Sequence, residues 1–387
     1  MSTLKVGGIR GVSASSDAIT VANDGTCTAN ITNNLSFRNL VINGAMEVAQ
    51  RGTTSTDEGY RTVDRFRNAF NGTDEAPTQE QADVVAGTTP YTLGFRKSYK
   101  LTNGNQTGGA GATDYLGFEH HIEAQNVATS GWNFKSSSSK LTLSFWIKSS
   151  VAQAFSGSIE APDSSPARFF KFTTASLSAD TWTKVTLQIP GDTNLGMNND
   201  TGTGLAVRLY GFIGTTYTSS DSDTETWVTG SNRYANTMTT TWYTTNDATL
   251  EITGVQLEVG SVATDFEHRT FAQEALLCKR YYQQIVGNSD LVMFGSGRAS
   301  GTDAALVATQ LAVPLRASPT IATVSYSAWG VGGSKSVSNG SPTVQSFDAT
   351  HNQLNMQFAS LAGQMTNART ACVACDSGST LKMDSEI

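Results

Sequence analysis

The sequence predicts a mainly β protein, and three observations lead to this class. Charged residues make up only 15% of the chain, whereas Ser, Thr, Asn and Gly are abundant. Runs rich in Thr, Val, Tyr, Phe and Trp, which suit a half-buried pleated surface, alternate with turn clusters of Gly, Asn, Asp and Ser. No helical pattern separates most of these runs, which favours a β-sandwich over a parallel α/β sheet.

The chain has 387 residues, long enough for two or three domains. We expect four parts. Residues 1–38 form an attachment or shaft segment, 39–269 form a β-sandwich, 270–287 form a connecting helix and 288–387 form a smaller C-terminal β-domain. The first part holds a short alternating run, residues 18–22, followed by a turn. Its few apolar residues can hardly offset the cost of ordering the backbone, so we expect it to fold only with partner chains.

Residues 39–47 are predicted to form a strand that ends in a turn. Further strands are predicted from alternating or continuous apolar runs at 95–101, 115–122, 141–148, 155–160, 169–172, 181–189, 205–213 and 248–259. The run at 141–148 alternates over most of its length, as a strand with one buried face should.

One helix is predicted over residues 270–286. Thr270 and Gln273 form a capping box, and Gly287 stands where a C-terminal cap would lie. The apolar residues follow heptad spacing: Phe271, Ala275, Cys278, Tyr282 and Ile285. This stripe fits a helix docked on the sandwich, and a short helical bundle around a symmetry axis is the alternative.

After residue 288 the β pattern returns, with strands predicted at 305–313, 320–325, 343–347, 352–358 and 372–374. Cys372 and Cys375 form a CxxC in the last of these runs. A zinc site would need a second ligand pair, which the other two cysteines do not form, so we expect two ordinary strand or core cysteines.

Charge and hydropathy exclude two kinds of partner. The formal net charge is −7 and no basic block is present, so we expect no nucleic-acid binding. No run approaches the roughly 20 apolar residues that cross a membrane, so we expect no membrane insertion. The first 13 residues lack the apolar core of a signal peptide, so release from the producing cell would need another route, such as lysis.

No pattern predicts an enzyme. The GxSxG turn of many serine nucleophiles is absent, and His120 and His121 should face opposite sides of a strand. His268, just before the helix, is interpreted as a structural hydrogen-bonding residue. Paired carboxylates could cleave glycans, but the sequence alone cannot place any two acidic residues at the required separation, and it lacks the repeats of a β-helical depolymerase.

Aromatic residues in polar loops are the candidate binding residues. Aromatic faces stack on the apolar face of a pyranose while amides and carboxylates bind its hydroxyls. Tyr217, Trp227 and Tyr234 lie in the most loop-like stretch, and Trp132 lies in a similar setting. Burial under the loop is the open alternative for each. Trp146 and Trp182 lie in predicted strands and are interpreted as core residues.

Several motifs in a fixed order resemble the tail-fibre and minor structural proteins of bacteriophages, especially marine and cyanobacterial ones. They are NLVINGAMEVAQRG at 39–52, VDRF at 63–66, LTLSFWIKS at 141–149, LEITGVQLEVGSVATDF at 250–266 and the following Glu267-His268-Arg269. The resemblance covers residues 39–285. The order of motifs also resembles jelly-roll carbohydrate-binding modules of the galactose-binding-like type. That resemblance implies a structural calcium with Glu47 as a possible ligand; a solvated or arginine-paired carboxylate is the alternative.

The resemblance implies a homotrimeric virion appendage, made in the host cytoplasm, that docks on other virion proteins through residues 1–38. The leading hypothesis is a fibre or spike protein, not an enzyme, that binds a host-surface glycan for adsorption. The alternative is a capsid-bound fibre or decoration protein with a purely structural role. A polysaccharide depolymerase is a third hypothesis. We expect no cofactor apart from the calcium that the resemblance allows.

Overall fold

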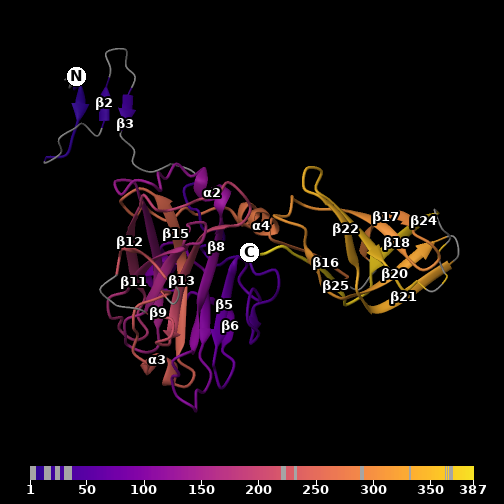
Figure 1. The fold of residues 1–387 in the computed structure, drawn as a ribbon, viewed down its shortest axis with the longest axis horizontal. Helices are drawn as coiled ribbons and strands as arrows, with labels where there is room; N and C mark the ends of the chain where they lie inside the picture. The colour runs from indigo at the N-terminus through magenta and orange to yellow at the C-terminus, as the bar shows by residue number, and fades with distance from the viewer. Residues whose placement is uncertain are drawn as a thin grey trace.

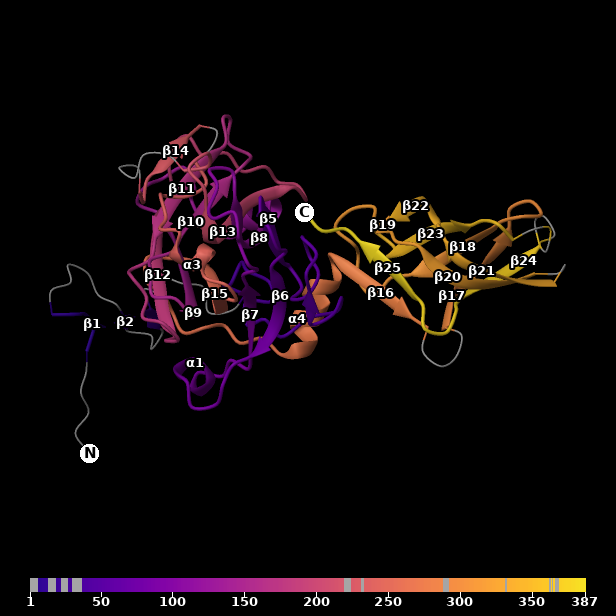
Figure 2. The ribbon, with the colours of Figure 1, turned by 90° about the horizontal axis from the view of Figure 1, so that it is seen from below.

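The computed structural model describes residues 6–12, 19–21, 27–29, 37–218, 224–230, 233–287, 292–330, 333–361, 363, 365 and 369–387. The protein is mainly β, as predicted, and its few helices are short. Two β-lobes lie side by side, and helix α4 and the chain end marked C lie at their junction (Figures 1 and 2).

The larger lobe is a sandwich of two six-stranded sheets. We call the first the tyrosine sheet, because of the residues on its outer face. Its order is β14-β11-β10-β13-β8-β5 and all its pairs are antiparallel. Its strands are β5 (Phe66–Asn71), β8 (Tyr115–Glu123), β10 (Ser156–Ala161), β11 (Arg168–Thr173), β13 (Thr203–Ile213) and β14 (Trp227–Thr229).

The second sheet, called the tryptophan sheet, has the order β12-β9-β15-β7-β6-β4 and is also antiparallel. Its strands are β4 (Thr54–Ser55), β6 (Thr78–Asp83), β7 (Lys97–Thr102), β9 (Lys140–Ser149), β12 (Thr183–Pro190) and β15 (Thr249–Val259). β12 lies at one edge of this sheet. The long strands β9 and β15 lie next to it, in that order.

The hydrophobic core lies between these two sheets. Alternate side chains of each strand point inward, so Leu143 and Phe145 of β9 meet Phe118 and Leu209 of the opposite sheet in one buried cluster. Period-2 alternation places every second residue on one face. All eight strands predicted between residues 95 and 259 are confirmed, with shifts of one or two residues at their ends.

The strand predicted at residues 39–47 is wrong. This stretch is a turn, and Asn43 and Met46 adopt left-handed backbone angles, with φ of 61° and 62°. The buried Asn43 amide holds the turn, since its nitrogen donates to the carbonyls of Val48 (2.8 Å) and Asp64 (2.9 Å). Gly44 is required because a Cβ there would lie 2.1 Å from the Val255 carbonyl oxygen.

The helix prediction is right at its start and wrong at its end. α4 spans Phe271–Lys279 and begins with the predicted capping box of Thr270 and Gln273. Residues Tyr282–Val286 form strand β16 instead, because they pair with β25 over five positions. Phe271 is 65% exposed, so the heptad stripe is not one buried seam. Three further helices are single turns: α1 (Thr89–Thr92), α2 (Ala124–Ala128) and α3 (Thr241–Thr244).

The smaller lobe has its own core between a three-stranded sheet, β16-β25-β19, and a seven-stranded sheet, β21-β20-β24-β17-β18-β23-β22. Cys372 and Cys375 lie in β24, as predicted. The strands are β16 (Tyr282–Val286), β17 (Val292–Ala299), β18 (Ala305–Gln310), β19 (Thr320–Ile321), β20 (Val324–Gly330), β21 (Gly333–Gly340), β22 (Thr343–Asp348), β23 (Gln353–Phe358), β24 (Thr370–Cys375) and β25 (Thr380–Asp384).

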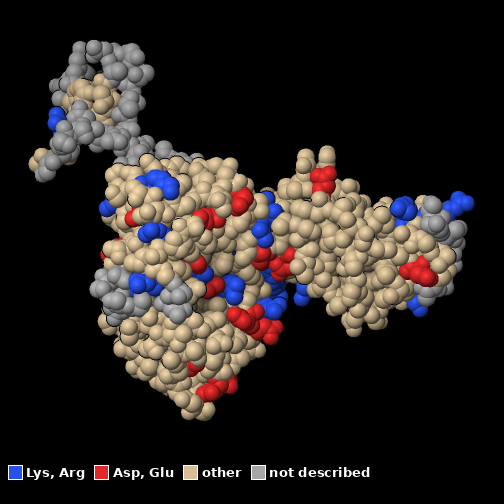
Figure 3. Space-filling view, viewed as in Figure 1, with Lys and Arg blue, Asp and Glu red and all other residues tan. Residues whose placement is uncertain are grey.

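A buried ionic cluster joins the lobes. Arg65, only 1% exposed, pairs with Glu386, and its guanidinium lies 3.4 Å from the centre of the Tyr281 ring. Arg51 pairs with Asp384 at 3.0 Å and Glu386 at 3.3 Å. Figure 3 shows blue and red side chains gathered along this junction, whereas most of the visible surface is uncharged.

The N-terminal part contributes a small antiparallel sheet of β1 (Gly8–Ile9), β2 (Ile19–Val21) and β3 (Cys27–Ala29). This sheet stands apart from both lobes (Figure 1). The side chains of Val6, Ile9 and Val12 are all exposed. Among the described residues, no helix is long and apolar enough to span a membrane.

Candidate functional site

Two of the predicted binding residues are brought together on the outer face of the tyrosine sheet. The chain leaves β13 and returns, and the backbone N–H of Tyr234 donates to the Tyr217 carbonyl at 3.1 Å. A parallel bridge between Thr218 and Ala235 continues this pairing. The rings of Tyr217 and Tyr234 therefore lie side by side, with centroids 6.3 Å apart at an interplanar angle of 71°.

A third tyrosine extends the aromatic surface. The ring of Tyr115, at the start of β8, meets Tyr217 edge to face at 5.4 Å. All three rings are half-buried, and they rest on the buried side chains of Tyr210 and Ile213. The packing below holds the rings in place, which leaves part of each ring free to contact a ligand.

A row of alternating charges crosses three strands beside these rings. Arg67, Glu119 and Arg208 are direct cross-strand neighbours on β5, β8 and β13. Neighbours at one level of adjacent strands share a face, so their side chains meet. One Glu119 oxygen lies 3.0 Å from Arg208, and the other lies 3.4 Å from Arg67. Glu160 of β10 also pairs with Arg208.

The electrostatics of this row keep Glu119 ionised. Burial raises the pKa of Glu119, but the His121 hydrogen bond and the Arg208 and Arg67 charges outweigh it and lower that pKa to about 2. Arg208 in turn lies 5.4 Å from the centre of the Tyr234 ring, so it joins the charged row to the aromatic surface.

Together the tyrosines and the charged row enclose a half-open pocket, which we call the tyrosine pocket. It provides about 220 Å³ of space for water-sized groups. Its lining residues are Arg67, Ala69, Tyr115, Glu119, Arg208, Tyr210, Ile213, Tyr217 and Tyr234. Such a pocket can stack a ring against tyrosine while fixed charges accept or donate hydrogen bonds at its edge.

Sequence reasoning missed Tyr115, Arg67, Glu119 and Arg208. The alternation of residues 115–122 carried a signal, because it places Tyr115 and Glu119 on one face of a strand. No sequence pattern indicated that Glu119 pairs with Arg67 and Arg208, since this pairing depends on the register between three strands that lie far apart in the sequence.

Trp132 and Trp227, the other two candidate binding residues, lie in the core cluster of the sandwich. Trp132 is 3% exposed and Trp227 9% exposed. The indole nitrogen of Trp227 donates to the Pro190 carbonyl at 2.7 Å, and its ring packs on Phe170. Neither side chain lines the tyrosine pocket, so the geometry of the site rests on the tyrosines.

The surroundings of Glu47 do not fit a calcium ion. Burial raises the pKa of Glu47, and the positive charges of Lys97 and Arg96 oppose this increase. Calcium sites instead gather several oxygen ligands. Within the described part of the chain, no group of three or more His, Cys, Asp or Glu residues could hold a metal.

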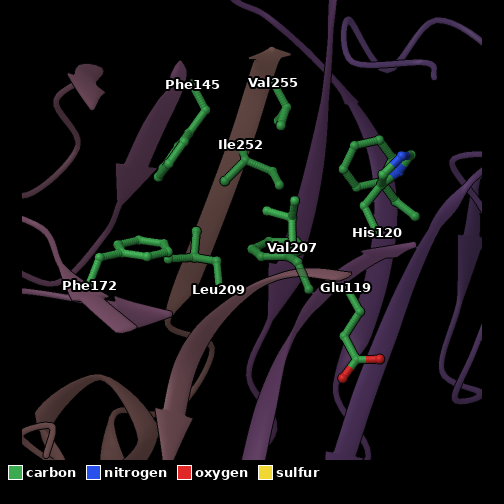
Figure 4. A pocket seen from close by; sticks show the side chains of 10 residues that line it. Glu119, His120, Phe145, Phe172, Val207, Leu209, Ile252 and Val255 are labelled. Atoms are coloured by element: carbon green, nitrogen blue, oxygen red, sulfur yellow. The ribbon is translucent and has the colours of Figure 1, made fainter. Parts of the chain in front are cut away.

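His120 and His121 face opposite sides of β8, as predicted. His120 is buried, and its ring packs on Phe66 with centroids 4.7 Å apart. It borders a void inside the core whose space for a water-sized group is only about 20 Å³. Figure 4 shows Phe145, Phe172, Leu209 and Ile252 around this void, and the Glu119 carboxylate pointing away from it. The void is a packing feature too small for a ligand.

Comparison with known proteins gives likenesses at low similarity. No protein-family model and no curated protein matches the sequence. Solved structures with a similar arrangement include the enzymatically active domain of tailspike protein 4 of bacteriophage CBA120, at 11% identity and a TM-score of 0.30 over 57% of this chain. They also include a xylan-binding domain from Paenibacillus barcinonensis (14% identity, TM-score 0.26, 50% of this chain and 91% of that one).

A family 11 carbohydrate-binding module from Clostridium thermocellum matches 56% of this chain and 98% of its own, at 12% identity and a TM-score of 0.24. The chain spans 21% of the tailspike chain, and 30% each of an α-L-arabinofuranosidase and an endo-1,4-β-D-xylanase. TM-scores this low carry no argument about this protein, so the sandwich is defined by its own strand order and core.

The charged row predicts a pH dependence of stability. The pKa of Glu119 in the folded chain is below its ordinary value, so the stabilisation is complete above about pH 4.5 and is lost as the pH falls towards 2. The shift corresponds to on the order of 3 kcal/mol. We expect Glu119→Gln to lower the free energy of unfolding near pH 7. In this variant the free energy of unfolding should also decrease less steeply as the pH falls below 4.5, as measured by urea denaturation.

The matched control is Glu80→Gln, because Glu80 pairs with Lys100 in a more exposed position on the other sheet. It should change the free energy of unfolding by less than about 1 kcal/mol. If the free energy of unfolding varied with pH in the same way in the wild type and in Glu119→Gln, the charged row would not hold Glu119 ionised in the folded protein.

Proposed function

We propose that the chain is a glycan-binding protein that holds a sugar ring in the tyrosine pocket. The observation that carries the proposal is the convergence of Tyr115, Tyr217 and Tyr234 on a half-open pocket with the charged row along its edge. Tyrosine presents a large apolar face to the C–H groups of a pyranose. The fixed charges of Arg67 and Glu119 can donate to and accept from its hydroxyls.

The electrostatics support binding over glycan cleavage. Glycosidases that use two carboxylates need one of them protonated near neutral pH, which requires a raised pKa. Here the pKa of Glu119 is about 2, and both Glu119 and Glu160 are paired with Arg208. A carboxylate held ionised in this way accepts hydrogen bonds from a ligand but has no proton to donate.

The setting that we propose is a phage fibre or spike that binds a glycan of the host surface. The small N-terminal sheet supports assembly with other chains, because Val6, Ile9 and Val12 are exposed on a unit too small to bury them alone. A homotrimer would carry three tyrosine pockets. Several weak sugar contacts on one particle then bind more tightly than one.

The test is titration of the full chain with a panel of neutral hexose oligosaccharides by isothermal calorimetry. Tyr234→Ala should weaken binding of the oligosaccharide that binds best by about tenfold, because it removes the ring between Arg208 and Tyr217. Thermal unfolding of the variant checks that the sandwich is intact.

Tyr91→Ala is the matched control, since Tyr91 is also half-buried and stacks on an arginine, Arg96, but lies outside the pocket. It should leave the affinity unchanged. If no neutral oligosaccharide binds, or if both variants bind as the wild type does, the tyrosine pocket is not a sugar site.

A further inference from the structure

The outer face of the tryptophan sheet carries two half-buried tryptophans among lysines. Trp146 of β9 lies directly opposite Lys184 of β12 in the register of the two strands. Two residues further along β9, the Lys148 ammonium lies 5.2 Å from the centre of the Trp182 ring. Cross-strand neighbours share a face, so these four side chains form a two-by-two patch of alternating aromatic and basic groups.

Trp146 also borders a pocket. A pocket with about 250 Å³ of space for water-sized groups lies between the outer face of the sheet and two loops, and Trp146, Ser144 and Lys184 form its sheet side. The loop side includes Asp265, Phe266 and His268. We call this the tryptophan pocket.

The loop wall of the tryptophan pocket is held in place by its own contacts. His268 is fixed to Leu93 by a bond of 2.9 Å between its Nε2 and the Leu93 carbonyl, and its ring packs on Phe266 at 4.9 Å. Thr264 bonds through its backbone N–H to Glu258 at 2.8 Å. A pocket whose walls are already in place binds with less loss of conformational freedom.

Lys184 and Lys148 favour an anionic ligand on the sheet side of the pocket, because the acidic residue that lines it, Asp265, lies on the loop wall. Lys184 is exposed and, within the described part of the chain, makes no ion pair. Lys148 is paired with Glu251 at 2.8 Å, yet its ammonium also faces the Trp182 ring. Lysines on edge strands commonly prevent edge-to-edge pairing. That role accounts for Lys184 alone and not for two tryptophans turned away from the core.

We propose that the tryptophan pocket and its patch form a second binding site, which takes an acidic polysaccharide. The Trp146 ring stacks on a sugar, and Lys184 and Lys148 pair with carboxylate or sulfate groups along the glycan. The site lies on the opposite outer face of the sandwich from the tyrosine pocket. It does not depend on that pocket, and one sandwich can hold two glycan chains at once.

The test uses the full chain and follows tryptophan fluorescence during titration with oligogalacturonate, with a sulfated oligosaccharide in a parallel titration. Binding of one of them should weaken about tenfold in Trp146→Ala and about threefold in Lys184→Ala. It should also weaken as the salt concentration rises, because exposed charges are screened. Lys335→Ala removes an equivalent exposed charge on the other lobe and should have no effect.

Tyr234→Ala in the same series separates the two sites. Tyr234→Ala should leave the affinity for acidic oligosaccharides unchanged, and Trp146→Ala should leave the affinity for neutral ones unchanged. Each proposal can therefore fail without affecting the test of the other. The second site is contradicted if neither acidic oligosaccharide binds, if Tyr234→Ala abolishes that binding, or if Lys184→Ala binds as the wild type does. Tighter binding of oligothymidylate through Trp146 would overturn the ligand class, since single-stranded nucleic acids also combine stacking with charge.

Discussion

Replacing Arg65 with methionine is expected to lower the free energy of unfolding by about 3–5 kcal/mol, the largest effect of any single change considered. Arg65 is 1% exposed, pairs with Glu386 and donates to the His121 carbonyl at 2.5 Å. Without it, Arg51 would be the remaining ion-pair partner of Glu386 among the described residues, and Arg51 also pairs with Asp64 and Asp384. Guanidinium denaturation of the wild type and the variant measures the loss.

The pH dependence of the free energy of unfolding tests this prediction in a second way. Burial already raises the pKa of Glu386, although Arg65 and Arg51 lower it. With Arg65 gone, that pKa rises further, so the folded variant binds a proton more readily than the unfolded chain does. Its stability should therefore recover in part as the pH falls towards 4.5. Arg61→Met, which removes a 52% exposed arginine, should change stability by less than about 0.5 kcal/mol. A loss below 1 kcal/mol in Arg65→Met would contradict the account of the junction.

The second large effect is expected at Asn43. Asn43→Ala should lower the free energy of unfolding by about 3–4 kcal/mol, because three buried hydrogen bonds disappear and alanine must adopt φ of 61°. Asn43→Gly loses the same side-chain bonds but accepts the backbone angle, so it should be about 1 kcal/mol more stable than Asn43→Ala. Urea denaturation of both variants separates the side-chain contribution from the backbone contribution. Equal stabilities would show that the left-handed angle carries no cost.

The sequence predicted eight of the sandwich strands, because one-sided burial leaves a period-2 pattern that is local. It missed β4, β5, β6 and β14. The Asn43 turn was mistaken for a strand because the apolar run of residues 40–42 looks like one. Only the left-handed angles and the amide contacts show the turn. The predicted end of α4 was wrong for a related reason. Tyr282 and Ile285 keep helical spacing, but they form a strand because they pair with β25, about 100 residues away in sequence.

The candidate site was predicted only in part. Tyr217 and Tyr234 were selected from loop composition, and the structure places both in the tyrosine pocket. The same reasoning selected Trp132 and Trp227, which are buried, and assigned Trp146 and Trp182 to the core, although both turn outward and remain half-exposed. Loop or strand context does not decide which face an aromatic ring takes. In β9, Leu143, Phe145 and Ile147 point into the core, so the period-2 alternation places Trp146 on the outer face.

The most direct test of the central claim is a crystal structure of the protein with the neutral oligosaccharide that binds best in calorimetry. We predict electron density for a sugar ring against Tyr217 and Tyr234, with hydroxyls within hydrogen-bonding distance of Arg67 or Glu119. Density for the bound sugar elsewhere, with the tyrosine pocket holding only water, would contradict the proposed function.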